Sequence, residues 1–266
     1  MAAKADLKRW SGWLALVIVF SVACALLSNW QFSRREEALA EIAQVARNYD
    51  ASPVGIDNVA SLNSFSSKNQ WRPVMLTGHY LVGNAVLVRN RPLNGQPGFL
   101  QVVPFQLEDG RLIAIERGWI ASDSNYQPPT NIPLPSGDEQ TVTARVRPAE
   151  PSLDRGAPKG QLGTLNIESL VVSQGIKDSI FTKVYARMAS EEIIPTATLK
   201  SLAKPELDEG NHLSYALQWI MFALMAVAAL IWGIKKEREA RGISKPTLKK
   251  RKVIGQVDAE VEDSLS

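Results

Sequence analysis

The sequence predicts an α+β membrane protein in which two transmembrane helices flank a mainly antiparallel β domain outside the cytoplasm. Residues 10–33 and 211–234 contain no Asp, Glu, Lys or Arg. Each run exceeds the roughly 20 residues that a helix needs to cross a bilayer core. Alternating apolar and polar residues over 71–122 predict strands. Basic residues gather outside the apolar runs, and this distribution predicts the orientation.

Charge placement predicts that both termini lie in the cytoplasm. The N-terminal segment holds three Lys or Arg against one Asp, the C-terminal segment holds nine against six acidic residues, and the segment between the runs holds 18 basic and 20 acidic residues. The positive-inside rule therefore places residues 34–209 outside the cytoplasm, and the expected location is the plasma membrane, with two passes. Arg34 and Arg35 oppose this orientation, but the basic cluster after residue 234 is larger. The predicted parts are a cytoplasmic N-terminus (1–9), transmembrane helices (10–33 and 211–234), an extracytoplasmic α+β domain (34–210) and a disordered, basic then acidic, cytoplasmic tail (235–266).

Aromatic residues near the ends of both runs support two spans, because their rings favour the headgroup level. These residues are Trp10, Trp13, Trp30, Tyr215, Trp219 and Trp232. The first run is too long for a signal peptide and lacks a clear exit site. Cys24 in "SVAC" faintly resembles a lipidation site, but Ser21 replaces the expected aliphatic residue, so Cys24 is better explained as a small apolar residue in the membrane. The predicted outer domain has no cysteine and therefore no disulfide.

The first helix is predicted to continue beyond the membrane, because Leu39, Ile42 and Ala46 recur at helical spacing. Pro53 and Gly55 then interrupt it. The strands predicted over 71–122 include "GFLQVVPFQL" and "RLIAIERGWI", joined by the hairpin signal "EDG".

The second half of the domain is predicted to contain fewer regular elements. A Pro-rich loop leads to the strand "QTVTARVRP". Asn166 and Gly175 bound a predicted short helix, as N-cap and as the residue just past its end. "DSIFTKVYARMA" has strand character, and "TATLKSLAKPELDEG" is a polar connector.

The strand "RLIAIERGWI" has no purely apolar face, which suggests a sheet covered on both sides or an edge used for binding. Alternation places Leu112, Ala114, Glu116, Gly118 and Ile120 on one face, and Ile113, Ile115, Arg117 and Trp119 on the other.

An enzyme is not expected, because the residues offer no catalytic constellation. The outer domain has one histidine, His79, whose strand pattern fits a packed or surface position. Neither a zinc cluster, nor a phosphate loop, nor a nucleophile elbow is present in the sequence. The basic tail is better explained by a membrane anchor near anionic lipid than by a nucleic-acid site.

The start of the second apolar run carries polar and aromatic residues on one helical stripe: His212, Tyr215, Trp219 and Phe222. Two interpretations remain open. The stripe is either an interfacial belt, or a half-buried imidazole above an aromatic wall, which suits a flat cofactor such as haem. Ser21, Ala25 and Ser28 in the first run, and Ala229 and Gly233 in the second, would allow the helices to pack closely as a hairpin.

Several short motifs occur together in a particular order. They are Trp30-Gln31 with Arg34; Arg72-Pro73-Val74 with Gly78; Pro104-Phe105; Arg117-Gly118-Trp119; and Asn211-His212-Leu213 with Tyr215 and Trp219. With the two apolar runs, this order resembles the Surfeit locus protein one family, assembly factors for cytochrome c oxidase. The stretch "ELDEGNHLSYALQW" looks most like actinobacterial members. The stretch 147–170 departs from the family, because it lacks an Asn-Pro and Trp-containing pattern found in many members.

The resemblance implies a non-enzymatic biogenesis factor, or chaperone, of the respiratory chain that helps to deliver or insert haem a into subunit I at the outer membrane face. His212 would be the axial ligand of the haem iron, with Tyr215 and Trp219 as the wall, and Gly118 and Trp119 would shape the domain above. Other oxidase subunits or assembly factors are further expected partners. The alternative is a haem-independent scaffold that binds oxidase subunits. A two-span sensor is disfavoured by the short tail, and an external hydrolase by the residue inventory.

Overall fold

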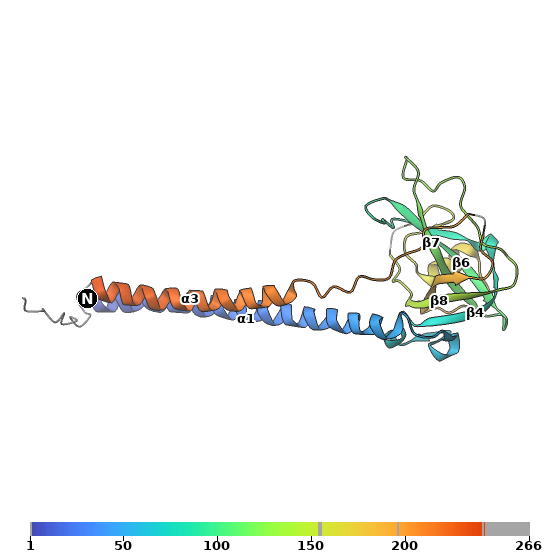
Figure 1. Ribbon diagram of the computed structural model, residues 1–266. Helices are drawn as coiled ribbons and strands as arrows, with labels where there is room; N and C mark the ends of the chain where they lie inside the picture. Colours follow the sequence, from blue (N-terminus) through green and yellow to red (C-terminus); the bar gives the residue numbers. More distant parts are fainter. Residues whose placement is uncertain (1, 154–155, 196, 241, 243–266) are drawn as a thin grey trace, which may run out of the picture. The chain divides into compact units, whose positions relative to one another are not determined.

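The computed structural model describes residues 2–153, 156–195, 197–240 and 242, and the chain forms two compact units. One unit contains the chain up to Arg35 and from Gly210 onward, and the other contains Glu36–Glu209. Helix α1 (Ala2–Asn48) begins in the first unit and ends in the second, as the predicted outward continuation requires (Figure 1). Helix α3 (His212–Ala240) lies in the first unit and ends six residues beyond the predicted limit at 234. The rest of the predicted tail, apart from residue 242, lies outside the described residues.

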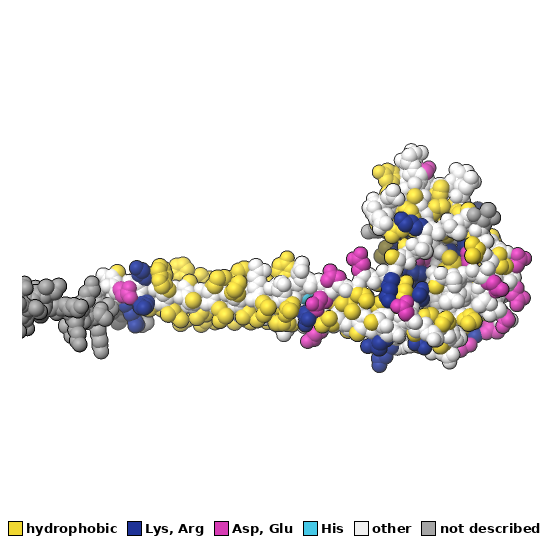
Figure 2. Space-filling model, viewed as in Figure 1, with side chains coloured by type: hydrophobic (Ala, Val, Ile, Leu, Met, Phe, Trp, Pro, Cys, Tyr) yellow, Lys and Arg dark blue, Asp and Glu magenta, His cyan; other side chains and the backbone are white. Residues whose placement is uncertain are grey.

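Within the described chain, α1 and α3 are the two helices long and apolar enough to cross a membrane. Large apolar side chains stand exposed along both helices, and Figure 2 shows them as a nearly continuous surface. Arg9 and Glu237, which flank the apolar stretch, form an ion pair. Water would not favour so much exposed apolar surface, whereas lipid would.

The two helices pack through residues that recur at alternating spacings of three and four. This spacing keeps one seam of each helix toward the other, as in left-handed helix pairs. The less exposed positions of the seam are Val17, Ser21, Cys24, Ser28 and Gln31 on α1, and His212, Ala216, Trp219, Ala223, Ala226, Leu230 and Gly233 on α3. Cys24, Ser28 and Ala216 are the most buried of these. The prediction that Ala25 lies on this face is wrong, because a spacing of three from Ser21 brings Cys24 there instead.

The second unit is built around a ring of five strands. They are β4 (Pro73–Tyr80), β8 (Gln140–Pro148), β10 (Val184–Glu191), β7 (Leu112–Ala121) and β6 (Gly98–Leu107), each hydrogen-bonded to the next. A further pairing between β4 and β6 closes the ring into a small barrel. Closure removes the exposed sheet edges that would otherwise invite aggregation.

The sheet is mixed: most of the strand pairings are antiparallel, as predicted, and three are parallel. Strand β10 runs parallel to β7 and antiparallel to β8. The chain between β7 and β10, which includes β8, supplies the crossover connection that parallel neighbours require. Two other parallel pairings involve short outer strands, β1 (Val54–Gly55) with β4 and β9 (Gln161–Leu162) with β5 (Val86–Val88). The remaining short elements are strands β2 (Ala60–Ser61) and β3 (Ser64–Phe65), and 3-10 turns at Ile56–Asn58, Ser67–Asn69 and Val82–Asn84.

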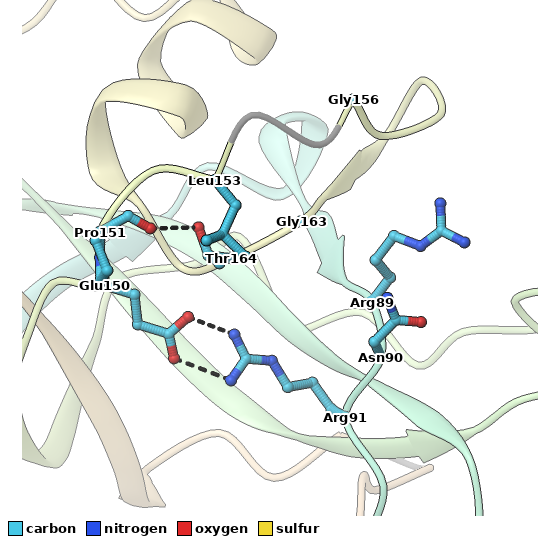
Figure 3. A pocket seen from close by; sticks show the side chains of 9 residues that line it. All are labelled: Arg89, Asn90, Arg91, Glu150, Pro151, Leu153, Gly156, Gly163 and Thr164. Carbon is cyan, nitrogen blue, oxygen red and sulfur yellow. Dashed lines mark hydrogen bonds and ion pairs between the residues drawn. The ribbon is translucent and has the colours of Figure 1, made fainter.

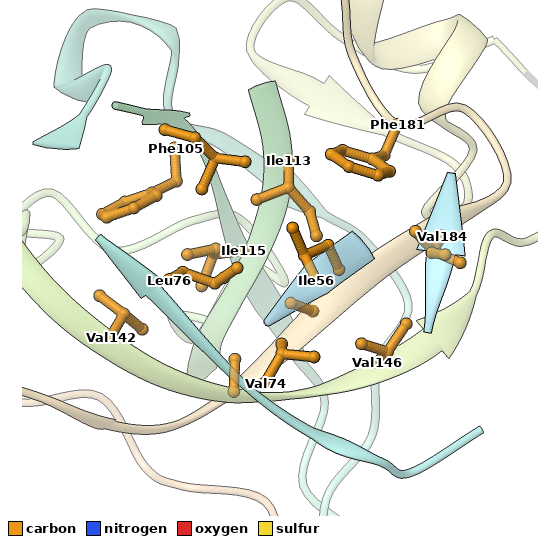
Figure 4. Close-up of a cluster of buried hydrophobic side chains, with 14 of the residues drawn as sticks. Ile56, Val74, Leu76, Phe105, Ile113, Ile115, Val142, Val146, Phe181 and Val184 are labelled. Carbon is orange, nitrogen blue, oxygen red and sulfur yellow. The ribbon is translucent and has the colours of Figure 1, made fainter. Parts of the chain in front are cut away.

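Two apolar clusters occupy the two faces of the barrel wall. The inner cluster draws on all five ring strands, and Figure 4 shows Leu76, Phe105, Ile115 and Val142 converging within it. The outer cluster fills the space between β5, β6, β7 and helix α2 (Ile167–Gln174). Strand β7 is therefore buried on both faces, which confirms the first of the two readings of its pattern.

The predicted alternation of β7 fails at Trp119. Trp119 packs in the outer cluster with Leu112 and Ala114, and not with the inward-facing Ile113. The cause is a β-bulge: Gln101 of β6 pairs with Gly118 and the next residue, Val102, pairs with Glu116, so that one β7 residue has no counterpart. Such an extra residue reverses the facing of those that follow.

Helix α2 has the predicted ends. The Asn166 side chain accepts a hydrogen bond from the Ser169 N–H (2.9 Å), and Gly175 adopts a left-handed conformation (φ 61°) just past the last turn. Both satisfy backbone groups that a helix end leaves unpaired.

We expect Asn166→Ala to lower the free energy of unfolding of the second unit by about 1 kcal/mol, because the Ser169 N–H loses its acceptor. Urea unfolding of the detergent-solubilised chain, followed by near-UV circular dichroism, measures the change. Asn166→Ser should recover most of the loss, since a hydroxyl can also cap. A full loss in both variants would show that the amide's other bond, to the Glu150 carbonyl oxygen (3.0 Å), is the important one.

Candidate functional site

The first candidate residue, His212, opens α3 and is held by α1. Its Nδ1 lies 2.8 Å from Oε1 of Gln31, a contact between residues 181 positions apart. An amide oxygen only accepts hydrogen bonds, so this contact places the proton of a neutral imidazole on Nδ1. The second nitrogen, Nε2, then carries a lone pair. Gly210, at φ 70°, precedes the helix, and a Cβ there would come within 3.5 Å of Nε2.

Close packing of the helices supports this end of the hairpin. Ser28 donates a hydrogen bond to the carbonyl oxygen of Ala216 (3.1 Å), and both residues are almost fully buried. Small side chains at these two positions let the backbones approach, which brings Gln31 within reach of His212 one turn further along.

The aromatic residues of the predicted stripe are divided between two sides of α3. Trp219 is half-buried on the face toward α1 and meets Phe222 edge-on, with ring centroids 5.8 Å apart. Tyr215 is 51% exposed on the flank of the helix. His212 and Trp219 thus share the packed face, two turns apart, and Tyr215 lies beside it.

The other predicted residues of α1 have different positions. Trp30 is 55% exposed, and Arg34 lies next to it on the exposed side of the helix. Gln31 is therefore the residue of this motif that points into the hairpin.

In the barrel, two of the predicted residues open a strand and one forms its corner. Pro73 is the first residue of β4, and Arg72 directly precedes it, with its carbonyl oxygen accepting from Val146 N–H (3.0 Å). Gly78 pairs with both β8 and β6, at the point where the ring closes. Its φ is 154°, and a Cβ would lie 1.9 Å from the Gln106 carbonyl oxygen, so only glycine fits.

The motif Arg117-Gly118-Trp119 attaches the connector that follows β10. Trp119 exchanges two backbone hydrogen bonds with Lys200 (2.8 and 2.9 Å). A Cβ on Gly118 would lie 2.8 Å from Cβ of Leu199, so the glycine permits this approach. The Trp119 indole N–H donates to the Arg91 carbonyl oxygen (2.6 Å), and the buried Arg117 forms an ion pair with Glu191 (2.6 Å).

A hollow of about 630 Å³ lies on the outside of the barrel, and sequence reasoning did not identify it. Figure 3 shows Arg91 paired end-on with Glu150, while Arg89 points away from that pair. Burial alone would raise the pKa of the Glu150 carboxyl, but hydrogen bonds from Arg91 and the Leu165 N–H lower this pKa below its ordinary value. These contacts fasten the loop that follows β8.

Sequence reasoning also missed Arg145 and Arg147, which stack on aromatic rings at the outer face of β8. Their alternation with apolar residues in "TARVRP" was the available signal. Among the residues that the structure describes, no three His, Cys, Asp or Glu side chains are grouped to hold a metal ion.

Comparison with known proteins identifies the family. The model of the SURF1 family matches residues 18–224. The chain belongs to the SURF1 family. This confirms the resemblance to the Surfeit locus protein one family that the sequence motifs indicated, and the match includes both His212 and Gln31.

SURF1-like relatives come from distant organisms. The chain is 30% identical to an uncharacterized SURF1-like protein of Mycobacterium tuberculosis over 238 residues, which is 86% of each chain. It is 24% identical to a SURF1-like protein of Rickettsia bellii over 245 residues, 85% of this chain and 92% of that one. It is also 27% identical to the cytochrome oxidase assembly protein SHY1 of Saccharomyces cerevisiae over 139 residues, 51% of this chain and 36% of the yeast protein.

Proposed function

We propose that this SURF1-family protein is an assembly factor for cytochrome c oxidase that holds haem a for insertion into subunit I. Family membership and the name of the yeast relative support the assembly role. The observation that supports the haem is the Gln31–His212 contact. In this proposal the protein is not an enzyme, and haem a is its cargo.

The residues at the hairpin end fit a haem ligand. A histidine binds iron through one ring nitrogen, and the other nitrogen usually donates to an oxygen that fixes the ring. Gln31 Oε1 is such an acceptor, which leaves Nε2 for the iron. The aromatic surface of Trp219 and the exposed ring of Tyr215 lie on the same stretch of α3 and would contact the macrocycle.

The proposal includes the orientation predicted from charge. Both termini would be cytoplasmic in the plasma membrane, α1 and α3 would each cross it, and the barrel would lie outside. His212 then begins α3 at the outer membrane face, where a polar imidazole is tolerated.

We expect His212→Ala to remove haem from the protein. Protein purified from cells that make haem a should show a Soret band in the wild type, and at least tenfold less in the variant. Gln31→Ala should weaken binding by about 10- to 100-fold, because the ring loses its orienting acceptor. His79→Ala is the matched control, since it removes the other histidine of the chain, and it should leave the band unchanged.

Equal Soret bands in the wild type and in His212→Ala would rule out the ligand role. If haem-free protein still co-purifies subunit I, and does so equally with His212→Ala, the scaffold function is favoured. The assembly role has its own test, gene deletion followed by oxidase activity and haem spectra of membranes. Normal cytochrome c oxidase in the deletion strain would contradict it.

A further inference from the structure

The outer face of β8 and β10 carries three guanidinium groups close together. Arg145 and Arg147 lie on the same side of β8, on either side of the inward-facing Val146. Arg187 of β10 stands directly opposite Arg145 in the strand register. Like charges opposite one another destabilise a strand pair, so this arrangement requires a compensating interaction.

Two aromatic rings lie beneath these cations. The guanidinium carbon of Arg145 is 3.8 Å from the centre of the Tyr49 ring, and that of Arg147 is 3.9 Å from the centre of the Trp71 ring. The two rings are 5.7 Å apart, and Arg187 also lies over Trp71 at 5.3 Å. Stacking on a ring covers one face of a guanidinium and leaves its N–H edge available.

Acidic partners neutralise only part of this charge. Arg187 pairs with the buried Glu116 (2.8 Å), and Lys204, which lies over Tyr49, pairs with Asp50 (2.6 Å). Arg145 uses its Nε to donate to the Tyr49 carbonyl oxygen (2.8 Å) and has no ion pair among the described residues.

Arg147 is the least compensated member of the cluster. Within the described part of the chain, no acceptor lies within hydrogen-bond distance of its buried Nε, and no carboxylate pairs with it. Burial lowers the pKa of this guanidinium below its ordinary value, and the neighbouring Arg187 lowers it further, while Tyr185, Glu116 and Glu150 oppose the shift. Desolvating an unpaired cation is unfavourable.

The backbone beneath Arg147 is also unusual. Trp71 adopts φ 70°, a left-handed conformation that is rare for a bulky side chain. Two backbone hydrogen bonds hold it there, from Trp71 N–H to the Val146 carbonyl oxygen (2.8 Å) and from Val146 N–H to the Arg72 carbonyl oxygen (3.0 Å). Backbone strain of this kind persists where the surroundings fix it and gathers at binding sites. A purely structural stack would need neither this strain nor unpaired charges.

We propose that Arg145 and Arg147 bind a small dianion, either a phosphate monoester or a pair of carboxylates, through the guanidinium N–H groups that stacking on the rings leaves available. Two uncompensated guanidiniums match two negative charges. Alternate residues of a strand are separated by about 6.8 Å, and the planar fork of arginine suits paired oxygen atoms. This site belongs to the barrel and is independent of the haem proposal.

Equilibrium dialysis of the full chain in a sugar detergent, with radiolabelled inorganic phosphate at constant ionic strength, tests the site. We expect saturable binding of one phosphate per chain with a dissociation constant below about 1 mM. Arg147→Gln should weaken binding at least about tenfold, as should Arg147→Lys, which keeps the charge but loses the planar fork. Lys183→Gln, a loss of one exposed positive charge at the start of β10, is the control and should change affinity less than about twofold.

Competition with succinate distinguishes the two sources of dianion. If succinate displaces the labelled phosphate at concentrations comparable with unlabelled phosphate, the ligand is a pair of carboxylates. If only unlabelled phosphate displaces it, the ligand is a phosphate monoester. Both results support the site. Absence of saturable binding overturns the proposal, as does equal affinity of the wild type and Arg147→Lys. The lysine variant keeps the test valid if Arg147→Gln fails to fold, which near-UV circular dichroism would reveal.

Discussion

Gly78→Ala is expected to unfold the barrel or to destabilise it by more than about 4 kcal/mol, in the range reached only by severe steric or buried-charge changes. The added Cβ would lie 1.9 Å from the Gln106 carbonyl oxygen and 3.0 Å from Cα of Leu107, and both are backbone atoms that cannot rotate away. The φ of 154° adds strain for any L-residue. The clash falls where β4 leaves β8 and joins β6, so relief would reopen the ring.

Gly83→Ala is the matched control, because a Cβ at Gly83 meets nothing within 4 Å in the structure. Its unfolding free energy should stay within about 0.5 kcal/mol of the wild type. Urea unfolding of the solubilised chain, read by near-UV circular dichroism, compares the two variants. Equal midpoints for Gly78→Ala and Gly83→Ala would show that the corner can relax, and that the ring does not depend on this glycine.

Arg117→Met is expected to cost about 3–5 kcal/mol, because it leaves the Glu191 carboxylate buried without its partner. The two side chains are only 2% and 6% exposed, and their N–O distance is 2.6 Å. Arg117 also donates to the Gln101 side chain (2.8 Å) and lies over the Tyr80 ring. Burial and the nearby Glu191 raise the pKa of the Tyr80 hydroxyl, so this tyrosine stays neutral and Arg117 is the cation that balances Glu191.

The double variant Arg117→Met, Glu191→Leu should recover most of this loss, since apolar replacement of both partners removes the unpaired charge. Arg111→Met serves as the control at a more exposed site. Arg111 pairs with Asp57 and Asp109, whose side chains are 67% and 49% exposed, so its loss should cost less than about 1 kcal/mol. Similar losses for Arg111→Met and Arg117→Met, by the same unfolding measurement, would contradict the role assigned to burial.

Local patterns predicted those elements whose signals lie within a few residues. Asn166 and Gly175 define α2 because a cap and a left-handed terminus are local chemistry. The continuation of α1 followed from spacing alone. The sequence did not predict the bulge in β7, because strict alternation of side-chain facing assumes that β6 and β7 stay in register. The error at Ala25 has a similar origin, since the seam of packed helices repeats every 3.5 residues, in alternating steps of three and four, and from Ser21 the next step is three.

The candidate site was predicted only in part. His212 was identified from its place at the head of an apolar run, but its contact with Gln31 spans 181 positions and depends on how the two helices pack. The stack of Arg145 on Tyr49 and Arg147 on Trp71 joins three separate segments, and the left-handed backbone of Trp71 has no sequence signal. Contacts of this kind arise from tertiary structure, so the periodicity of a single sequence does not predict them.

The position of β10 in the ring determines when the barrel can form during synthesis. This strand fills the gap between β8 and β7, yet it is the last of the five to leave the ribosome. Until then the nascent chain holds two unsatisfied strand edges, which are prone to misassociation. At about 5–20 residues per second, α3 begins to emerge only seconds after β10, since Glu191 and His212 are separated by 20 residues. Closure of the barrel and emergence of α3 from the ribosome are therefore nearly simultaneous events in the life of the chain.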